Sequence, residues 1–257
     1  MSEAHKEKGK IFLHRGDLTQ ARHWFELALA EDRVCGLAPS LTETLGNLGN
    51  VCAMMGALGE ADQYYREVLA IQRAEPDPQA VGRTLINLGN IQVETGHPEL
   101  ARPYYLEALD MLTPIQDHRS LGILYSNLGL QEAAAQRHDE AIAAFKQALD
   151  SHRVAGDEDG LAVTYSQLGK TFLAAGRNDQ AEKCLNNASE HFIKLGNEPG
   201  EAAVLRLLAS LYEQRGDRLS AVRCLERVVV VNSRYRLPRA AEDDARLAVL
   251  RNARLKR

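Results

Sequence analysis

Small and large apolar side chains recur along this chain at a fixed interval of forty residues. The small residue is glycine in five copies and alanine in the sixth: Gly9, Gly49, Gly89, Gly129, Gly169 and Ala209. Sixteen residues after each comes a large apolar side chain: Phe25, Tyr65, Tyr105, Phe145, Leu185 and Leu225. Self-similarity at a period of this length indicates a stacked array. We expect the small residue to let two helices approach closely, and the large one to fill the space between neighbouring copies.

Each copy reads as two helices separated by a turn. Apolar positions recur three and four residues apart, and the helix-favouring residues Ala, Leu, Glu and Gln dominate. Glycine at the break within a copy, as at Gly56, permits a left-handed helix end. Asp17, Asn178 and Asp217 follow such breaks and are expected to cap the next helix. No segment of any length has the period of a strand, so the pattern predicts an all-α solenoid of helix-turn-helix repeats.

The spacing divides the chain into repeats and a different C-terminal stretch. Six repeats are expected within residues 1–237, at about 2–36, 42–76, 82–116, 122–156, 162–196 and 202–236. Residues 238–257 read as a capping helix with a basic tail, which would cover the last repeat. The small and apolar positions expected on this helix are Ala241, Ala245, Ala248, Val249 and Leu255. Acidic residues at its start and basic residues at its end suit the helix dipole.

Composition and charge narrow the class of protein. The chain has 257 residues, of which 45% are hydrophobic and 26% charged, and this is the composition of a folded domain. A net charge of −4 argues against a general nucleic-acid binder. Neither a secretory signal nor a membrane span is visible. Four scattered cysteines without a C-x-x-C pair suit a reducing compartment, so we expect a cytoplasmic protein.

The pattern Leu48-Gly49-x-x-Cys52 followed by Ala61-x-x-x-Tyr65 resembles the signature of the tetratricopeptide repeat (TPR). The resemblance covers almost all of the chain and implies a right-handed superhelix with a concave groove. The repeat here is forty residues instead of about 34, and the proline that usually ends the second helix is replaced, for example by Arg33 and Arg73. Both helices should therefore be longer. Forty-residue repeats with an Asn-Leu-Gly-Asn core, as at 47–50 and 87–90, resemble those of kinesin light chain and of Pins-type adaptors.

In that family the first helix of each repeat lines the groove. By resemblance, the candidate peptide-binding residues are Lys6, Lys10, Asn47, Asn50, Arg83, Asn87, Asn90, Asn127, Gln167, Lys170 and Arg206. An asparagine side chain both donates and accepts, so a row of them can pair with the backbone of an extended peptide. The alternative is that these amides cap turns or form hydrogen bonds between helices. The cations would select acidic groups, unless Glu43 and Glu94 pair with Arg83 internally.

Two further features bear on the groove. Lys6, Asn47 and Arg83 stand at places that match the carboxylate clamp of chaperone-binding TPR domains, but Lys10 and Asn87 depart from it, so the resemblance is partial. Repeats four to six offer a more apolar lining, at Leu130, Ala133, Ala134, Val163 and Ala203. We therefore expect a graded groove, polar in its first half and apolar in its second.

Catalytic, metal and cofactor sites are not indicated. The spacing of nine between His5, His14 and His23 does not put three ligands on one helical face. Motifs for zinc proteases, nucleophile elbows and phosphate loops are missing from the sequence. Cys184 and Cys224 occupy equivalent places in adjacent copies, which indicates a packing role. The prediction is a protein that is not an enzyme and needs no metal or cofactor.

These patterns predict an adaptor or scaffold for protein–protein interaction, which binds a partner peptide or helix in its groove. Two alternatives stay open. Open repeat arrays can dock end to end, so the chain could be a self-assembling scaffold that forms homo-oligomers. The basic end of the C-terminal helix could instead contact nucleic acid and make the protein a regulator.

Overall fold

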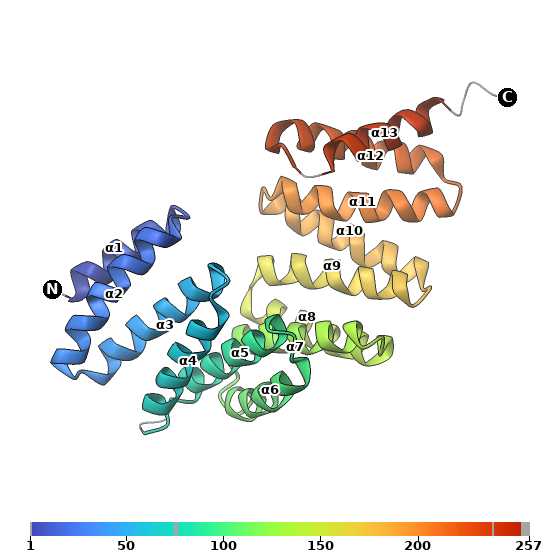
Figure 1. Ribbon diagram of the computed structural model, residues 1–257. Helices are drawn as coiled ribbons and strands as arrows, with labels where there is room; N and C mark the ends of the chain where they lie inside the picture. The colour runs from blue at the N-terminus through green and yellow to red at the C-terminus, as the bar shows by residue number, and fades with distance from the viewer. Residues whose placement is uncertain (1, 75–76, 238, 253–257) are drawn as a thin grey trace. The chain divides into compact units, whose positions relative to one another are not determined.

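The computed structural model describes residues 2–74, 77–237 and 239–252, and these residues form thirteen α-helices and no strand (Figure 1). They follow one another in antiparallel pairs: α1 (Ser2–His14) with α2 (Leu18–Cys35), α3 (Ala38–Met54) with α4 (Leu58–Gln72), α5 (Pro78–Glu94) with α6 (Pro98–Leu112), α7 (His118–Ala134) with α8 (His138–Ala155), α9 (Glu158–Ala174) with α10 (Asn178–Lys194), and α11 (Glu198–Gln214) with α12 (Arg218–Tyr235). A last helix, α13 (Ala240–Asn252), follows. The all-α class of helix-turn-helix repeats is confirmed.

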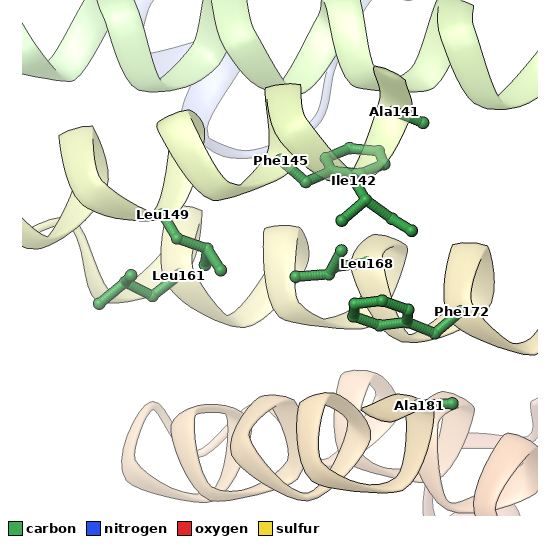
Figure 2. Packing of buried hydrophobic residues seen from close by; sticks show 8 residues of the cluster. All are labelled: Ala141, Ile142, Phe145, Leu149, Leu161, Leu168, Phe172 and Ala181. Atoms are coloured by element: carbon green, nitrogen blue, oxygen red, sulfur yellow. The ribbon is translucent and has the colours of Figure 1, made fainter. Parts of the chain in front are cut away.

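The chain divides into two compact units, Met1–Leu124 and Tyr125–Arg257, with the boundary inside α7. In the first unit, Phe25 of α2 packs with Leu45, Leu48 and Val51 of α3. In the second unit, α8 packs on α9, and Figure 2 shows Leu149 beside Leu161 and Phe145 above Leu168. The sequence-based division into six repeats within 1–237 and a separate cap stays a prediction.

Short polar side chains and left-handed residues fix the helix ends. Asp17 and Asp217 accept hydrogen bonds from the backbone N–H of Gln20 and Ser220, so both predicted caps are confirmed. Asn178 is not a cap, because it is the first residue of α10 itself. The turn inside a repeat carries a glycine at positive φ in five copies, as at Gly56 with φ 76°, but Gln136 takes this position in the fourth copy with φ 60°.

The repeating glycines allow close helix packing. A Cβ atom added at Gly49 would lie 2.7 Å from Tyr65 Cε1, and one added at Gly89 would lie 2.3 Å from Tyr105 Cε1. The large residue therefore lies over the glycine of its own repeat. It also contacts the next repeat, as expected, because Phe145 belongs to one cluster with Leu161 and Leu168.

The last helix packs through few of the small and apolar positions named from the sequence. Ala241, Ala245, Ala248 and Val249 are exposed, and 68% of Val249 is accessible. Leu247 is buried instead, with Ala209 and Leu225. Asp243 is also buried, and the hydrogen bonds that it accepts from Arg206 and Asn232 offset the cost of burying its charge. Leu255 and the basic residues Arg254, Lys256 and Arg257 lie outside the described residues.

Candidate functional site

Two adjoining hollows lie along α1, α3 and α5, the first helices of three successive repeats in the first unit. One, the Glu94 hollow, has a volume of about 440 Å³ and is lined by Leu13, His14, Asn50, Ala53, Met54, Tyr65, Asn87, Asn90, Ile91 and Glu94. The other, the Arg83 hollow, has a volume of about 310 Å³ and is lined by Pro39, Thr42, Glu43, Gly46, Asn47, Asn50, Tyr65, Val68, Gln72, Ala80, Arg83, Thr84 and Asn87. They share Asn50, Tyr65 and Asn87, and together they form the candidate groove of this unit.

The amides at Asn50 and Asn90 already bind a side chain of their own repeat. The Tyr65 hydroxyl donates to Asn50 Oδ1 at 2.6 Å, and the Tyr105 hydroxyl donates to Asn90 Oδ1 at 2.7 Å. Burial raises the pKa of both tyrosines, and the nearby charge of Glu94 adds to this, so both hydroxyls stay protonated donors. The Oδ1 atoms of Asn50 and Asn90 therefore form hydrogen bonds between helices, which is the alternative that we left open.

This pairing was visible in the sequence but was missed. Asparagine follows the repeating glycine where the large residue sixteen positions after that glycine is tyrosine, as in the pairs Asn50–Tyr65 and Asn90–Tyr105. Where the large residue lacks a hydroxyl, as at Phe145, the matching position holds another residue, Leu130. The amide therefore depends on a partner fifteen residues further along the chain.

Asn47 differs from the other amides. Its Nδ2 atom is buried and has no hydrogen-bond partner among the described residues. Asn47 lines the Arg83 hollow. Leaving a buried donor unsatisfied costs about 1–3 kcal/mol, so this atom marks a place in the groove where an acceptor from a ligand would be stabilising.

Lys6 and Lys10 are both paired with Glu43. Lys6 Nζ lies 2.8 Å from Glu43 Oε2, and Lys10 Nζ lies 3.0 Å from Glu43 Oε1. Only 2% of Lys6 is exposed, and its Nζ also donates to Ser40. Lys6 therefore belongs to a buried polar network, and neither lysine presents an unpaired charge to the groove.

That network centres on Asp32, a buried carboxylate where α1, α2 and α3 meet. It accepts hydrogen bonds from Ser2 at 2.6 Å, from Ser40 at 2.7 Å and from Thr44 at 2.6 Å. Burial alone would raise its pKa, but these three donors and the charge of Lys6 outweigh burial and hold the pKa below its usual value. Nothing in the sequence distinguishes Asp32, because one acidic residue at the end of a helix resembles a solvated one.

Arg83 and Glu94 are the charges of the groove that stay unpaired. Both side chains are exposed, and neither forms a hydrogen bond or ion pair with another described residue, although the charge of Arg83 helps to hold the pKa of Asp117 below its usual value. The internal pairing that we considered for Arg83 is therefore absent from the described part of the chain, since Glu43 binds the lysines instead. Asn87 is half-buried and lines both hollows.

The remaining predicted groove residues lie in the second unit. Asn127 and Gln167 are half-buried, and Lys170 is exposed. Arg206 donates to Asp243 and to Asn232, both at 2.7 Å, so it holds α13 in place. Leu130 and Val163, from the predicted apolar lining, are 43% and 50% exposed. Ala134 and Ala203 are exposed, and Ala133 is half-buried.

The histidines and cysteines considered for metal binding or catalysis pack against other side chains of the fold. No group of three His, Cys, Asp or Glu side chains in the described ranges is arranged to hold a metal ion. The rings of His5 and His23 each lie 5.5 Å from that of Trp24. Burial raises the pKa of Cys184 and Cys224 to about 11, so these thiols are poor nucleophiles at neutral pH. Within the same ranges no helix has the length and apolar character to cross a bilayer.

Comparison by sequence identifies the repeat. The family profile described as tetratricopeptide repeat matches residues 1–74, 40–113, 120–190 and 161–229, which together are most of the chain. The chain belongs to the tetratricopeptide repeat family. No curated protein matches this TPR chain in a sequence search.

Solved structures with the same fold share little of its sequence. A signal transduction ATPase with numerous domains (STAND) and a TPR sensor, from Pyrococcus horikoshii, aligns with 98% of the TPR chain at 15% identity and a TM-score of 0.83, but the aligned part is 39% of that protein. BtubC from P. vanneervenii aligns over 85% of the TPR chain and 89% of its own, at 17% identity and a TM-score of 0.71. Kinesin light chain-like repeats from Podosopora anserina align over 78% and 98%, at 20% identity and a TM-score of 0.62, as the Asn-Leu-Gly-Asn cores predicted. Identities this low show the fold alone.

Proposed function

We propose that this TPR protein is a non-catalytic adaptor or regulator that binds a segment of a partner protein in the groove of its first unit. The observation that supports this most is the unsatisfied Asn47 Nδ2, buried beside a hollow. Packing of the repeat does not need this donor, whereas the amide oxygens of Asn50 and Asn90 hold tyrosines. A partner's backbone carbonyl would complete its hydrogen bonding.

Similar folds support a role in recognition. The Pyrococcus horikoshii ATPase carries its TPR array as a sensor, and an array that detects another molecule does so by binding it. Four free cysteines in this chain favour a reducing compartment, so we infer a cytoplasmic location.

The test of this function should fill the groove without removing a structural contact. Replacing Asn50 or Asn90 would leave a buried tyrosine hydroxyl unsatisfied and would lower stability as well as binding. Asn87→Arg avoids this, because Asn87 lines both hollows and its longer replacement would project into them. Gln63→Arg is the matched control, since it adds the same charge to an exposed position of α4 outside the hollows.

The experiment is a quantitative affinity capture from lysate with the wild-type protein and both variants. Proteins that bind in the groove should be retained by the wild type and by Gln63→Arg but lost with Asn87→Arg, while all three proteins melt at similar temperatures. Partners that bind Asn87→Arg as well as the wild type would show that the groove of the first unit is not the binding site.

A further inference from the structure

The two hollows of the groove have opposite polarity. The helices α1, α3 and α5 end at His14, Met54 and Glu94, and all three of these residues line the Glu94 hollow. The C-terminal end of a helix carries a partial negative charge, and the unpaired carboxylate of Glu94 adds a full one. A cationic group is therefore favoured here.

The wall of the Glu94 hollow fits a long basic side chain. Leu13, Ala53, Met54 and Ile91 supply apolar surface beside the carboxylate. Lysine and arginine pack their aliphatic stems on such surface while the charged end reaches a polar partner. A small inorganic cation would leave the apolar wall uncovered, so a basic residue of a protein segment is the better match.

The Arg83 hollow is suited to the opposite charge. Pro39 and Ala80, in the first turns of α3 and α5, line it, so it lies toward the positive ends of these helices. Arg83 forms no ion pair with a described residue, although its charge acts on Asp117, and Asn47 Nδ2 is an unsatisfied donor. Glu43 also lines this hollow, but both its oxygens are bound by lysines. An acidic or carbonyl group is therefore favoured here.

The spacing of the two charges sets the spacing in the ligand. Arg83 and Glu94 are eleven residues apart on α5, which corresponds to about 16 Å along a helix. An extended chain covers this distance in about five residues. We propose that the groove of the first unit recognises an extended protein segment in which a basic side chain at Glu94 and an acidic side chain at Arg83 are about five residues apart. This rests on the proposed function and differs from our expectation that this half of the groove reads acidic groups and peptide backbone.

The test is a displayed library of random twelve-residue peptides, selected on the full-length protein at low salt. Selected peptides should carry Lys or Arg about five positions from Asp or Glu. In fluorescence anisotropy, Glu94→Gln should weaken their binding about three- to ten-fold, as expected for one partly exposed ion pair. Glu99→Gln, an exposed carboxylate on α6 outside both hollows, should leave binding unchanged. Arg83→Gln and the exposed Arg15→Gln form the second pair of variants.

Charge reversal separates recognition from a loss of folding. A peptide whose base is replaced by Glu should bind poorly to the wild type and regain affinity for Glu94→Lys. If selected peptides lack the base–acid pair, or if Glu94→Gln and Glu99→Gln behave alike, this inference is wrong, while the proposed function stands as long as Asn87→Arg abolishes binding. If no peptide binds the wild type better than Asn87→Arg, the proposed function fails and the inference with it.

Discussion

At the scale of the residue, one hydroxyl explains why asparagine recurs in the repeats. Tyr105 packs on Gly89, and its hydroxyl reaches Asn90. In the fourth repeat Phe145 packs on Gly129 in the same way, without a hydroxyl to satisfy, and leucine follows the glycine. The identity of one residue in the first helix thus depends on one atom of the second helix.

The glycines of the repeat give a matched pair for a stability test. A Cβ atom at Gly89 would lie 2.3 Å from the Tyr105 ring, whereas one at Gly46 would meet nothing within 4 Å. Gly89→Ala should therefore lower the free energy of unfolding by about 1–3 kcal/mol through overpacking. Gly46→Ala should raise it by about 0.5–1 kcal/mol, because glycine is unfavourable inside a helix. Denaturant unfolding measures both, and equal effects of the two changes would contradict this account of packing.

At the scale of the element, equivalent polar residues join the end of one repeat to the start of the next. Asp32 accepts from Thr44, and forty residues later Gln72 accepts from Thr84. Asn232, at the same place in the sixth repeat, donates to Asp243 at the start of α13. These contacts orient consecutive helices, since each hydrogen bond needs one particular geometry.

The network of Asp32 predicts a pH-dependent loss of stability. The pKa of Asp32 is lower in the folded protein than in the unfolded chain. Its charge therefore stabilises the fold at any pH above the pKa of the unfolded chain, which is about 4. This contribution is lost as the pH falls through the folded value. Asp32→Asn should therefore cost about 1–3 kcal/mol at pH 7, because an amide NH2 replaces one of the two carboxylate oxygens and leaves a hydroxyl donor without its acceptor.

The measurement is the free energy of unfolding of wild type and Asp32→Asn between pH 3 and 7. The difference between the two proteins should shrink at the acidic end. Asp110→Asn, an exposed position on α6, is the control and should follow the wild type throughout. A difference that is the same at every pH would mean that the charge of Asp32 does not contribute.

At the scale of the whole molecule, stability should be distributed along the chain. In repeat arrays each repeat contacts its neighbours, so the energy is close to a sum of local terms. Each of the two compact units has a core of its own, with Phe25 and Leu48 in the first and Phe145 and Phe172 in the second. Damage to one repeat should therefore stay near that repeat.

Hydrogen exchange followed by mass spectrometry can test this. Gly89→Ala disturbs the contact between α5 and α6, so amides in these helices and their neighbours should exchange faster than in the wild type. Amides in α11 and α12 should keep their rates. Equal acceleration in all helices would show that the chain unfolds as one cooperative body.

The sequence was informative where local chemistry decides and less so where a distant partner decides. Glycine spacing predicted the repeats, and Asp17 and Asp217 were recognised as caps from their position after a glycine. The roles of Lys6 and Arg206 could not be read in this way. Each lies on the expected helix, but it forms an ion pair with a carboxylate 37 residues further along the chain. A repeat pattern predicts which face of a helix a residue lies on, but it does not predict which ion pairs that residue forms with neighbouring helices.

The position of Glu43 between two lysines has a consequence for competition. A ligand carboxylate that sought Lys6 and Lys10 would first have to displace Glu43, which is tethered to the site and holds both amines. A tethered group acts at an effective concentration in the millimolar range, far above that of most proteins in a cell. The chain thus carries a resident competitor for its own lysines. Free C-terminal carboxylates, the ligands of the clamp that this arrangement resembles, would be excluded by occupancy and not by shape.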